Sequence, residues 1–226
     1  MIKRTLDIVL GTVLAVLMTP LIIVLAIGAA LSLRTWPFFA HRRIGRGGRE
    51  FVMVKIRTMP PSTPIYADRD AVANVPIPPF CALLRRLHID ELPQLYHVPF
   101  GQMSLVGPRP EVRAFHEQMD PEFAALRTSV RPGCSGLWQV TDGIKHLHYD
   151  VPIYDRFYVA NANIKLDLWI LLHTLTLVSP GRRTRTLAEV PRWTLPKDVH
   201  HLGEIIDMRT ATTAHELART NLAADA

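Results

Sequence analysis

Asp90 and Glu91 stand side by side, and Arg109 follows in the same stretch between Pro108 and Pro110. A carboxylate can act as a nucleophile, and a second carboxylate can hold a divalent cation beside it. Arginine presents a planar fork of donors that matches phosphate oxygens, and the neighbouring prolines restrict its backbone. These residue types therefore predict a site that handles a charged, phosphorylated substrate.

A structural interpretation of the two acids is also open. Successive residues of a helix point about 100° apart, so Asp90 and Glu91 do not share one helical face. At the first turn of a helix, however, Asp90 would serve as an N-cap and Glu91 as a favourable charge near the free N–H groups. Spacing alone does not separate a catalytic pair from a capped helix.

The basic residues give a second set of candidates. The chain carries a formal net charge of +6 and has a pI of about 9.7, which favours anionic partners. There is no glycine-rich nucleotide fingerprint, and aromatic residues are not interleaved with the basic clusters, so nucleic-acid binding is not expected. A solvated basic face, or contact with anionic lipid, is the alternative to phosphate binding. The candidate phosphate ligands are Lys55, Arg57, Arg85, Arg86 and Arg109.

The elements that must position these residues begin with an apolar segment. Ile8 to Leu33 contains no charged residue, and as a helix it would be about 39 Å long against about 30 Å of bilayer hydrocarbon. The run is too long for a cleaved signal peptide, and no small-residue cleavage site leads into a polar start. It therefore predicts a membrane helix.

Thr19 and Pro20 lie near the middle of that helix. Proline removes a backbone donor, so a kink is expected there. Lys3 and Arg4 precede the segment and a basic cluster from Arg34 to Arg49 follows it, so the positive-inside bias favours both ends in the cytoplasm. We expect a broken helix that re-enters the same leaflet, with an ordinary kinked span as the alternative.

The rest of the chain has the pattern of a small, mainly helical α/β domain with one β-hairpin. Phe38 to Thr58 is predicted to form the hairpin, with its turn at 45–48. Residues 59–79 carry six prolines and are expected to form a loop. Helices are expected at Phe80–His88, Asp90–Val98, Pro110–Thr128, Pro152–Val178 and Glu204–Ala223, and a short strand is expected at the end of Arg131–Val140.

Several motifs together resemble one family. The stretches are KRTLDIVLG, WPFFAHRRIGRGGREFVMVKIRTM, LRRLHIDELPQLYHVPFGQMSLVGPRPE, RPGCSGLWQV and YVANANIKLDLWILLHTL. From about Lys3 to Ser179 the chain is similar to the bacterial sugar transferases, monotopic phosphoglycosyl transferases that act on polyprenyl phosphate. The most specific part is DELPQL followed by MSLVGPRP.

The resemblance implies a mechanism and a role for each site residue. Asp90 would be the nucleophile that attacks the sugar-bearing phosphate of a nucleoside-diphosphate sugar, most often a UDP-sugar, and Glu91 would bind Mg²⁺. The nucleoside monophosphate leaves, and polyprenyl phosphate then attacks the aspartyl intermediate to give a polyprenyl-diphosphate-linked sugar that starts a surface glycan. The residues that would bind substrate are Lys55, Arg57, Arg86, Arg109 and Gln139.

The resemblance also implies a location and a division of the chain. Residues 1–36 would form the re-entrant membrane helix, 37–180 the catalytic domain with interfacial amphipathic helices, and 181–226 a C-terminal extension. The protein would reside in the bacterial inner membrane, in contact with lipid, with its catalytic domain facing the cytoplasm, and a homodimer is left open. The chain departs from the family after WQV, where TDGIK lacks the usual arginine, so a non-catalytic scaffold of a glycan-assembly complex is the alternative function.

Overall fold

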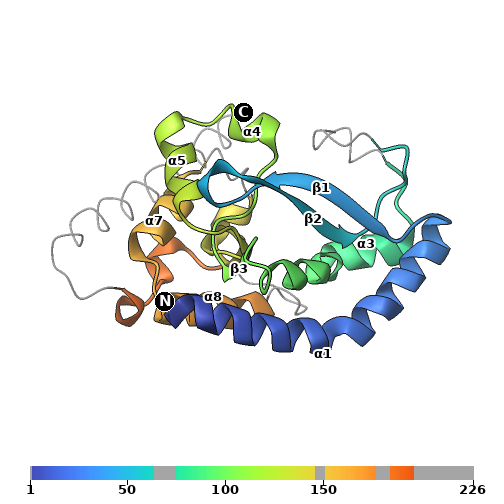
Figure 1. The fold of residues 1–226 in the computed structure, drawn as a ribbon, viewed down its shortest axis with the longest axis horizontal. Coiled ribbons are helices and arrows are strands. Elements are labelled where there is room, and N and C mark those ends of the chain that lie inside the picture. Colours follow the sequence, from blue (N-terminus) through green and yellow to red (C-terminus); the bar gives the residue numbers. More distant parts are fainter. Residues whose placement is uncertain (1, 64–74, 146–150, 177–183, 196–226) are drawn as a thin grey trace, which may run out of the picture.

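The computed structural model describes residues 2–63, 75–145, 151–176 and 184–195. As expected, its described part is mainly helical, and it contains two small two-stranded sheets. In Figure 1 the long helix α1 runs below the domain, and the β1–β2 hairpin lies above it. The elements are α1 (Ile2–Leu33), β1 (Phe38–Ile44), η1 (Arg46–Gly48), β2 (Glu50–Ile56), α3 (Pro79–Arg86), η2 (Ile89–His97), β3 (Ser104–Val106), α4 (Arg113–His116), α5 (Pro121–Ser129), β4 (Gly133–Ser135), α6 (Leu137–Val140), η3 (Asp142–Lys145), α7 (Ile153–Asn161), α8 (Ile164–Thr176), η4 (Leu187–Glu189) and η5 (Arg192–Thr194).

Helix α1 packs on the rest of the protein through its small residues. Its buried positions include Gly11, Ala15, Ala26 and Ala29, which fall on one side of the helix. A Cβ atom at Gly11 would lie 2.6 Å from Cγ1 of Val98, so the helix backbone comes very close to the end of η2. Most of its large apolar side chains are exposed instead, and the helix is long and apolar enough to cross a membrane.

Polar side chains tie the first turns of α1 to the domain. Lys3 Nζ lies 2.5 Å from Oδ2 of Asp167 on α8. Asp7 accepts hydrogen bonds from Oγ of Ser104 at 2.8 Å and from the backbone N of Leu105 at 3.1 Å. The apolar helix is therefore built into the folded domain and is not a separate appendage.

Helix α1 is bent but not interrupted. It runs continuously from Ile2 to Leu33 with Pro20 inside it, and its axis changes direction about halfway along (Figure 1). Oγ1 of Thr19 donates to the carbonyl of Ala15, one turn back, at 2.8 Å, and lies 2.6 Å from the hydroxyl of Tyr96 on η2. The expected broken helix is thus corrected to a bent one, because proline removes only one backbone donor and the turns on both sides keep theirs.

The predicted hairpin is confirmed. Strands β1 and β2 pair antiparallel, with Phe39 opposite Lys55. Gly47 and Gly48 have φ angles of 67° and 74°, a left-handed region that glycine enters without steric cost, so the chain reverses at the predicted turn. Met53 is buried on one face of β2, and Lys55 follows on the same face.

The sequence pattern does not anticipate a second, parallel pair of strands. Strand β3 pairs with β4, with Ser104 opposite Gly133 and Val106 opposite Ser135. Each strand has only three residues, too few for an alternation of apolar and polar residues to be visible. Tyr158 of α7 donates to the carbonyl of Val106 at 3.0 Å and so joins this sheet to the helical core.

Two other expectations are wrong in detail. Residues 110–128 form two short helices, α4 and α5, instead of one. Asp120 accepts a hydrogen bond from the N of Phe123 at 2.9 Å and Pro121 opens α5, so a new helix starts there. The apolar residues 137–140 form the helical turn α6, and the strand lies earlier, at β4.

Residues after 183 pack against the main hydrophobic core. Leu187 and Val190 are only 1% and 2% exposed and belong to the main hydrophobic core. The first part of the expected C-terminal extension, residues 184–195, is therefore packed on this core, and the division of the chain at residue 180 stays a prediction. The helix expected at 204–223 lies outside the described residues.

Candidate active site

The two adjacent acids lie at the start of η2, which follows α3 almost directly. His88 separates the two helices and has a φ of 56°, a left-handed conformation uncommon for residues other than glycine. This turn places Asp90 and Glu91 in the first turn of η2. Because His88 itself occupies the N-cap position, the capping role considered for Asp90 is wrong.

Asp90 is buried among charges, with 4% of its surface exposed. Burial and then the negative charge of Glu91 raise the pKa of Asp90 to about 6, while Lys55, Arg85 and Arg109 act in the opposite direction. A carboxyl group with this pKa is largely ionised at neutral pH yet poorly solvated. That combination suits a nucleophile.

Glu91 is held by Arg109 through two hydrogen bonds. Nη1 of Arg109 donates to Oε2 at 3.1 Å, and Nη2 donates to Oε1 at 2.5 Å. Burial alone would raise the pKa of Glu91, but the charge and hydrogen bonds of Arg109 outweigh it and lower the pKa to about 2. The same negative charge raises the pKa of Arg109. The predicted metal ligand and the predicted phosphate ligand therefore contact each other in the structure.

Lys55 and Arg85 complete the set of charges around Asp90. Burial lowers the pKa of Lys55, and the charges of Glu91 and Asp90 partly offset that effect. Lys55 Nζ also lies 5.6 Å from the centre of the Phe39 ring, on the opposite strand. Arg85, in the last turn of α3, acts electrostatically on both Asp90 and Lys55. We call the following five residues the charge cluster: Lys55, Arg85, Asp90, Glu91 and Arg109.

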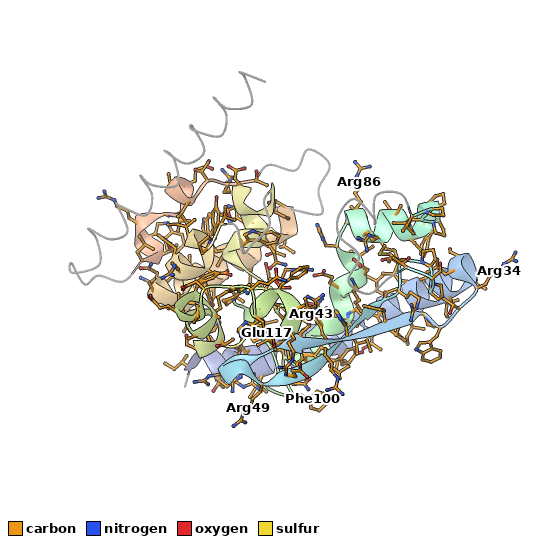
Figure 2. The ribbon with its side chains drawn as sticks, turned by 90° about the horizontal axis from the view of Figure 1, so that it is seen from above. Arg34, Arg43, Arg49, Arg86, Phe100 and Glu117 are labelled. Atoms are coloured by element: carbon orange, nitrogen blue, oxygen red, sulfur yellow. The ribbon has the colours of Figure 1, made fainter. Side chains whose placement is uncertain are left out.

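Two predicted phosphate ligands, Arg57 and Arg86, form no hydrogen bond or ion pair with the charge cluster among the described residues. Nε of Arg57 donates to the carbonyl of Trp36 at 3.2 Å, at the open end of the hairpin. Arg86 is exposed and points away from the body of the protein (Figure 2). Its neighbour Arg85 stands near Asp90 instead. The sequence cannot choose between two adjacent arginines, because the face that each occupies depends on how α3 packs.

Gln139 lies beside Cys134, and the charge of Glu91 acts on the thiol of Cys134. Its Nε2 donates to the carbonyl of Cys134 at 3.4 Å, whereas its Oε1 is buried and accepts no hydrogen bond from the described residues. Burial and then the charge of Glu91 raise the pKa of Cys134 to about 12, so the thiol remains protonated. Because this oxygen is buried, the substrate-binding role expected for Gln139 stays a prediction.

A divalent cation fits this site when it is shared with a substrate. The described residues contain no group of three or more His, Cys, Asp and Glu side chains that could hold a metal by themselves. Asp90 and Glu91 offer two adjacent carboxylates, and Mg²⁺ ordinarily binds one or two carboxylates together with phosphate oxygens and water. The two carboxylates therefore suit a Mg²⁺ ion only if a substrate phosphate would supply further ligands.

Comparison with known proteins finds relatives over most of the chain. Residues 1–181 match the family model described as bacterial sugar transferase. The chain is 34% identical over 186 residues to the UDP-N-acetylgalactosamine-undecaprenyl-phosphate N-acetylgalactosaminephosphotransferase of Aeromonas hydrophila, a match that covers 80% of this chain and 44% of the relative. It is 33% identical over 199 residues to the exopolysaccharide production protein ExoY of Rhizobium meliloti, covering 80% and 87%. It is 35% identical over 188 residues to the UDP-glucose:undecaprenyl-phosphate glucose-1-phosphate transferase of Caulobacter vibrioides, covering 76% and 68%. The chain thus spans less than half the length of the Aeromonas relative.

Proposed function

The chain belongs to the bacterial sugar transferase family, and from this premise we propose that it transfers a sugar 1-phosphate from a UDP-sugar to polyprenyl phosphate and releases UMP. The observation that carries the proposal is the buried carboxyl of Asp90, with a pKa of about 6, inside the charge cluster. The names of the Aeromonas and Caulobacter relatives describe transfer of a sugar phosphate to undecaprenyl phosphate. The product would be the first lipid-linked intermediate of a surface glycan.

In the first half-reaction, a carboxylate oxygen of Asp90 attacks the phosphorus that bears the sugar. A bond forms between this oxygen and phosphorus while the bond from phosphorus to the bridging oxygen breaks, and UMP leaves with that oxygen. Negative charge spreads over the phosphoryl oxygens, and Lys55, Arg85 and Arg109 can neutralise it from fixed positions. No proton has to move, so an ionised carboxylate is sufficient.

In the second half-reaction, an oxygen of polyprenyl phosphate attacks the same phosphorus. The bond between phosphorus and Asp90 breaks, and the carboxylate of Asp90 is regenerated. Donor and acceptor are both anionic and would repel each other if they bound together. A covalent intermediate lets each occupy the same cationic site in turn, which gives ping-pong kinetics.

Arg109 and Glu91 are proposed to separate when the donor binds. In the structure Glu91 satisfies the guanidinium fork of Arg109. A diphosphate offers paired oxygens of the same geometry and carries more charge, so Arg109 can turn to the phosphate and leave Glu91 available for Mg²⁺. When bound, the cation would neutralise charge on the diphosphate and stabilise the departing UMP.

The membrane arrangement that we propose is monotopic, with α1 re-entering the cytoplasmic leaflet of the bacterial inner membrane and α8 lying along its surface. The ion pair between Lys3 and Asp167 joins these two helices. The charge cluster would then lie close to the interface, where the phosphate of a lipid acceptor can reach it. The outer face of α8 carries a stripe of exposed apolar side chains at helical spacing: Ile164, Leu168, Leu172 and Leu175.

Release of UMP from a panel of UDP-sugars tests this function. The full chain, purified in lipid–detergent micelles, is given Mg²⁺ and undecaprenyl phosphate. We expect one or a few donors to yield UMP and lipid-linked sugar, and Asp90→Asn to yield neither. Glu117→Gln, which changes an exposed acid on the domain surface, serves as the control and should behave as wild type. A folded wild-type protein that turns over no donor would instead favour a non-catalytic scaffold.

A further inference from the structure

A buried ion pair between Arg127 and Asp155 contacts the main chain at Arg109. Nε of Arg127, on α5, donates to Oδ2 of Asp155, on α7, at 2.7 Å, and each side chain is only 4% exposed. Nη2 of the same guanidinium donates to the main-chain carbonyl of Arg109 at 2.8 Å. One side chain therefore connects a core helix to the backbone of the proposed phosphate ligand.

The guanidinium of Arg127 is held by its surroundings on several sides. Its Nη1 lies 3.6 Å from Sδ of Met119, and the guanidinium carbon lies 5.7 Å from the centre of the Phe123 ring. Asp155 is part of α7, a helix that buries Phe157 completely in the main core. The donor that reaches Arg109 is thus fixed to a well-packed part of the domain.

Stability alone does not account for this pair. Moving two charges out of water costs free energy that their attraction recovers only in good geometry, and apolar side chains of similar volume are often at least as stabilising. The carbonyl of Arg109 also needs a partner of its own, because the preceding carbonyl, that of Pro108, is the one that accepts from the N of Gly133, at 2.9 Å. Arg127 supplies that partner.

We propose that Arg127 is a positioning residue for Arg109, acting through the Arg109 carbonyl, and that Asp155 holds Arg127 in place. This inference rests on the proposed function, because it concerns how Arg109 meets Glu91 and the donor phosphates. The carbonyl bond fixes the peptide from which the Arg109 side chain extends. A fork that must match two oxygens at once tolerates little displacement, so loss of this bond lowers turnover even when the fold is intact.

The decisive variant replaces both buried charges with apolar side chains, Arg127→Met together with Asp155→Leu. It removes the bond to Arg109 and leaves no buried charge unpaired, so its thermal unfolding midpoint should fall only by the cost of the lost hydrogen bond to the Arg109 carbonyl. Its kcat/KM for the UDP-sugar should fall on the order of 10²-fold, the cost of displacing a catalytic group by about 1 Å. A double variant that folds and turns over like wild type overturns the proposal.

Arg127→Lys provides a second test that does not depend on an apolar core. Lysine keeps the charge beside Asp155 but lacks the fork that serves two partners. If Arg127 acts through Arg109, Arg127→Lys alone should lower kcat/KM on the order of 10²-fold. In an Arg109→Lys background, where the fork is already lost, the same substitution should lower kcat/KM less than about threefold. Equal losses in both backgrounds would leave Arg127 a purely structural role and overturn the proposal.

Two controls separate positioning from general damage. Arg113→Met, on the nearby helix α4, removes an exposed ion pair with Glu50 of β2, and it should leave kcat/KM unchanged. Leu166→Ala opens the core far from Arg109 in sequence and should lower the unfolding midpoint with little effect on kcat/KM. An inactive wild-type protein would overturn the proposed function and this inference together, whereas active wild-type protein with equally active Arg127 variants would overturn this inference alone.

Discussion

Arg109 donates hydrogen bonds to both carboxylate oxygens of Glu91, with Nη2 2.5 Å from Oε1 and Nη1 3.1 Å from Oε2. Each residue is proposed to contact a different part of the substrate complex, so each must leave the other for the complex to form. Binding of the donor diphosphate frees Glu91, and binding of the cation to Glu91 frees Arg109. The two affinities should therefore be linked, with each ligand tightening the binding of the other by the same factor.

Asp90→Asn should reduce UMP release to the background rate, because an amide is not a nucleophile toward phosphorus. Wild-type enzyme given the correct donor without acceptor should gain the mass of a sugar phosphate, and peptide mass spectrometry should place it on Asp90. An adduct on another residue, or near-normal turnover by Asp90→Asn, would contradict the assignment.

The first half-reaction should depend on pH through the ionisation of Asp90. Only the carboxylate attacks, and its pKa is about 6, so the single-turnover kcat/KM should rise about tenfold per pH unit below 6 and level off above it. Lys55 lowers the pKa of Asp90, so Lys55→Met should move the acidic limb to higher pH. A profile that is flat from pH 5 to 8 would show that another step limits the rate or that Asp90 is not the nucleophile.

Asp90→Asn should also stabilise the folded protein at neutral pH. The folded-state pKa of about 6 lies above the ordinary value of 3.8, so ionised Asp90 destabilises the fold above pH 6 and this cost disappears as the pH falls below about 4. The shift corresponds to about 2–3 kcal/mol at pH 7.5. Thermal unfolding midpoints of the two proteins should differ at pH 7.5 and converge near pH 4, and a lower midpoint for the variant at pH 7.5 would contradict this.

Glu91→Gln should lower turnover strongly and change the dependence on Mg²⁺. The amide is a poorer ligand for a hard cation and no longer holds Arg109 by charge, so more Mg²⁺ should be needed for half-maximal rate. Chelation with EDTA should abolish wild-type activity, and added Mg²⁺ should restore it. Full activity in EDTA would remove the cation from the proposed mechanism.

Both ends of α1 should be reachable from the cytoplasm. Single cysteines at Ile2 and Trp36, in a background with Cys81 and Cys134 replaced by serine, should react with impermeant thiol reagents in inverted vesicles and not from the periplasmic side. The bend at Pro20 makes this return path feasible. Labelling of the residue 2 site from the periplasm would indicate a true span, whereas Pro20→Leu should favour such a span if the helix normally re-enters.

Local patterns predict much of this fold. The β1–β2 hairpin follows from its alternation and its glycine turn, and α7 and α8 follow from their apolar residues. The break between α4 and α5 was also readable, because Asp120 before Pro121 is a helix-start signal. The pairing of β3 with β4 could not be predicted from the sequence, because two three-residue strands carry no visible alternation and their contact depends on the whole fold.

In the candidate site too, the sequence identifies individual residues but not the tertiary contacts between them. Motif resemblance identifies Asp90, Glu91 and Arg109, but it cannot show that the last two contact each other. The choice between Arg85 and Arg86 depends on how α3 packs, and the role inferred for Arg127 depends on α5 meeting a loop from elsewhere in the chain. Such relationships arise from tertiary contacts, which residue spacing does not encode.

The small residues along the inner side of α1 have a consequence for how this protein can be divided into parts. A Cβ at Gly11 would collide with Val98, and one at Gly28 would lie 2.7 Å from the ring of Phe80, so at these two positions a larger side chain would force a neighbour to move. A generic apolar helix fused to the rest of the protein in place of α1 would not reproduce this close approach. Helix α1 is thus not an interchangeable module, and removing it would expose the surface on which η2, and with it Asp90, is supported.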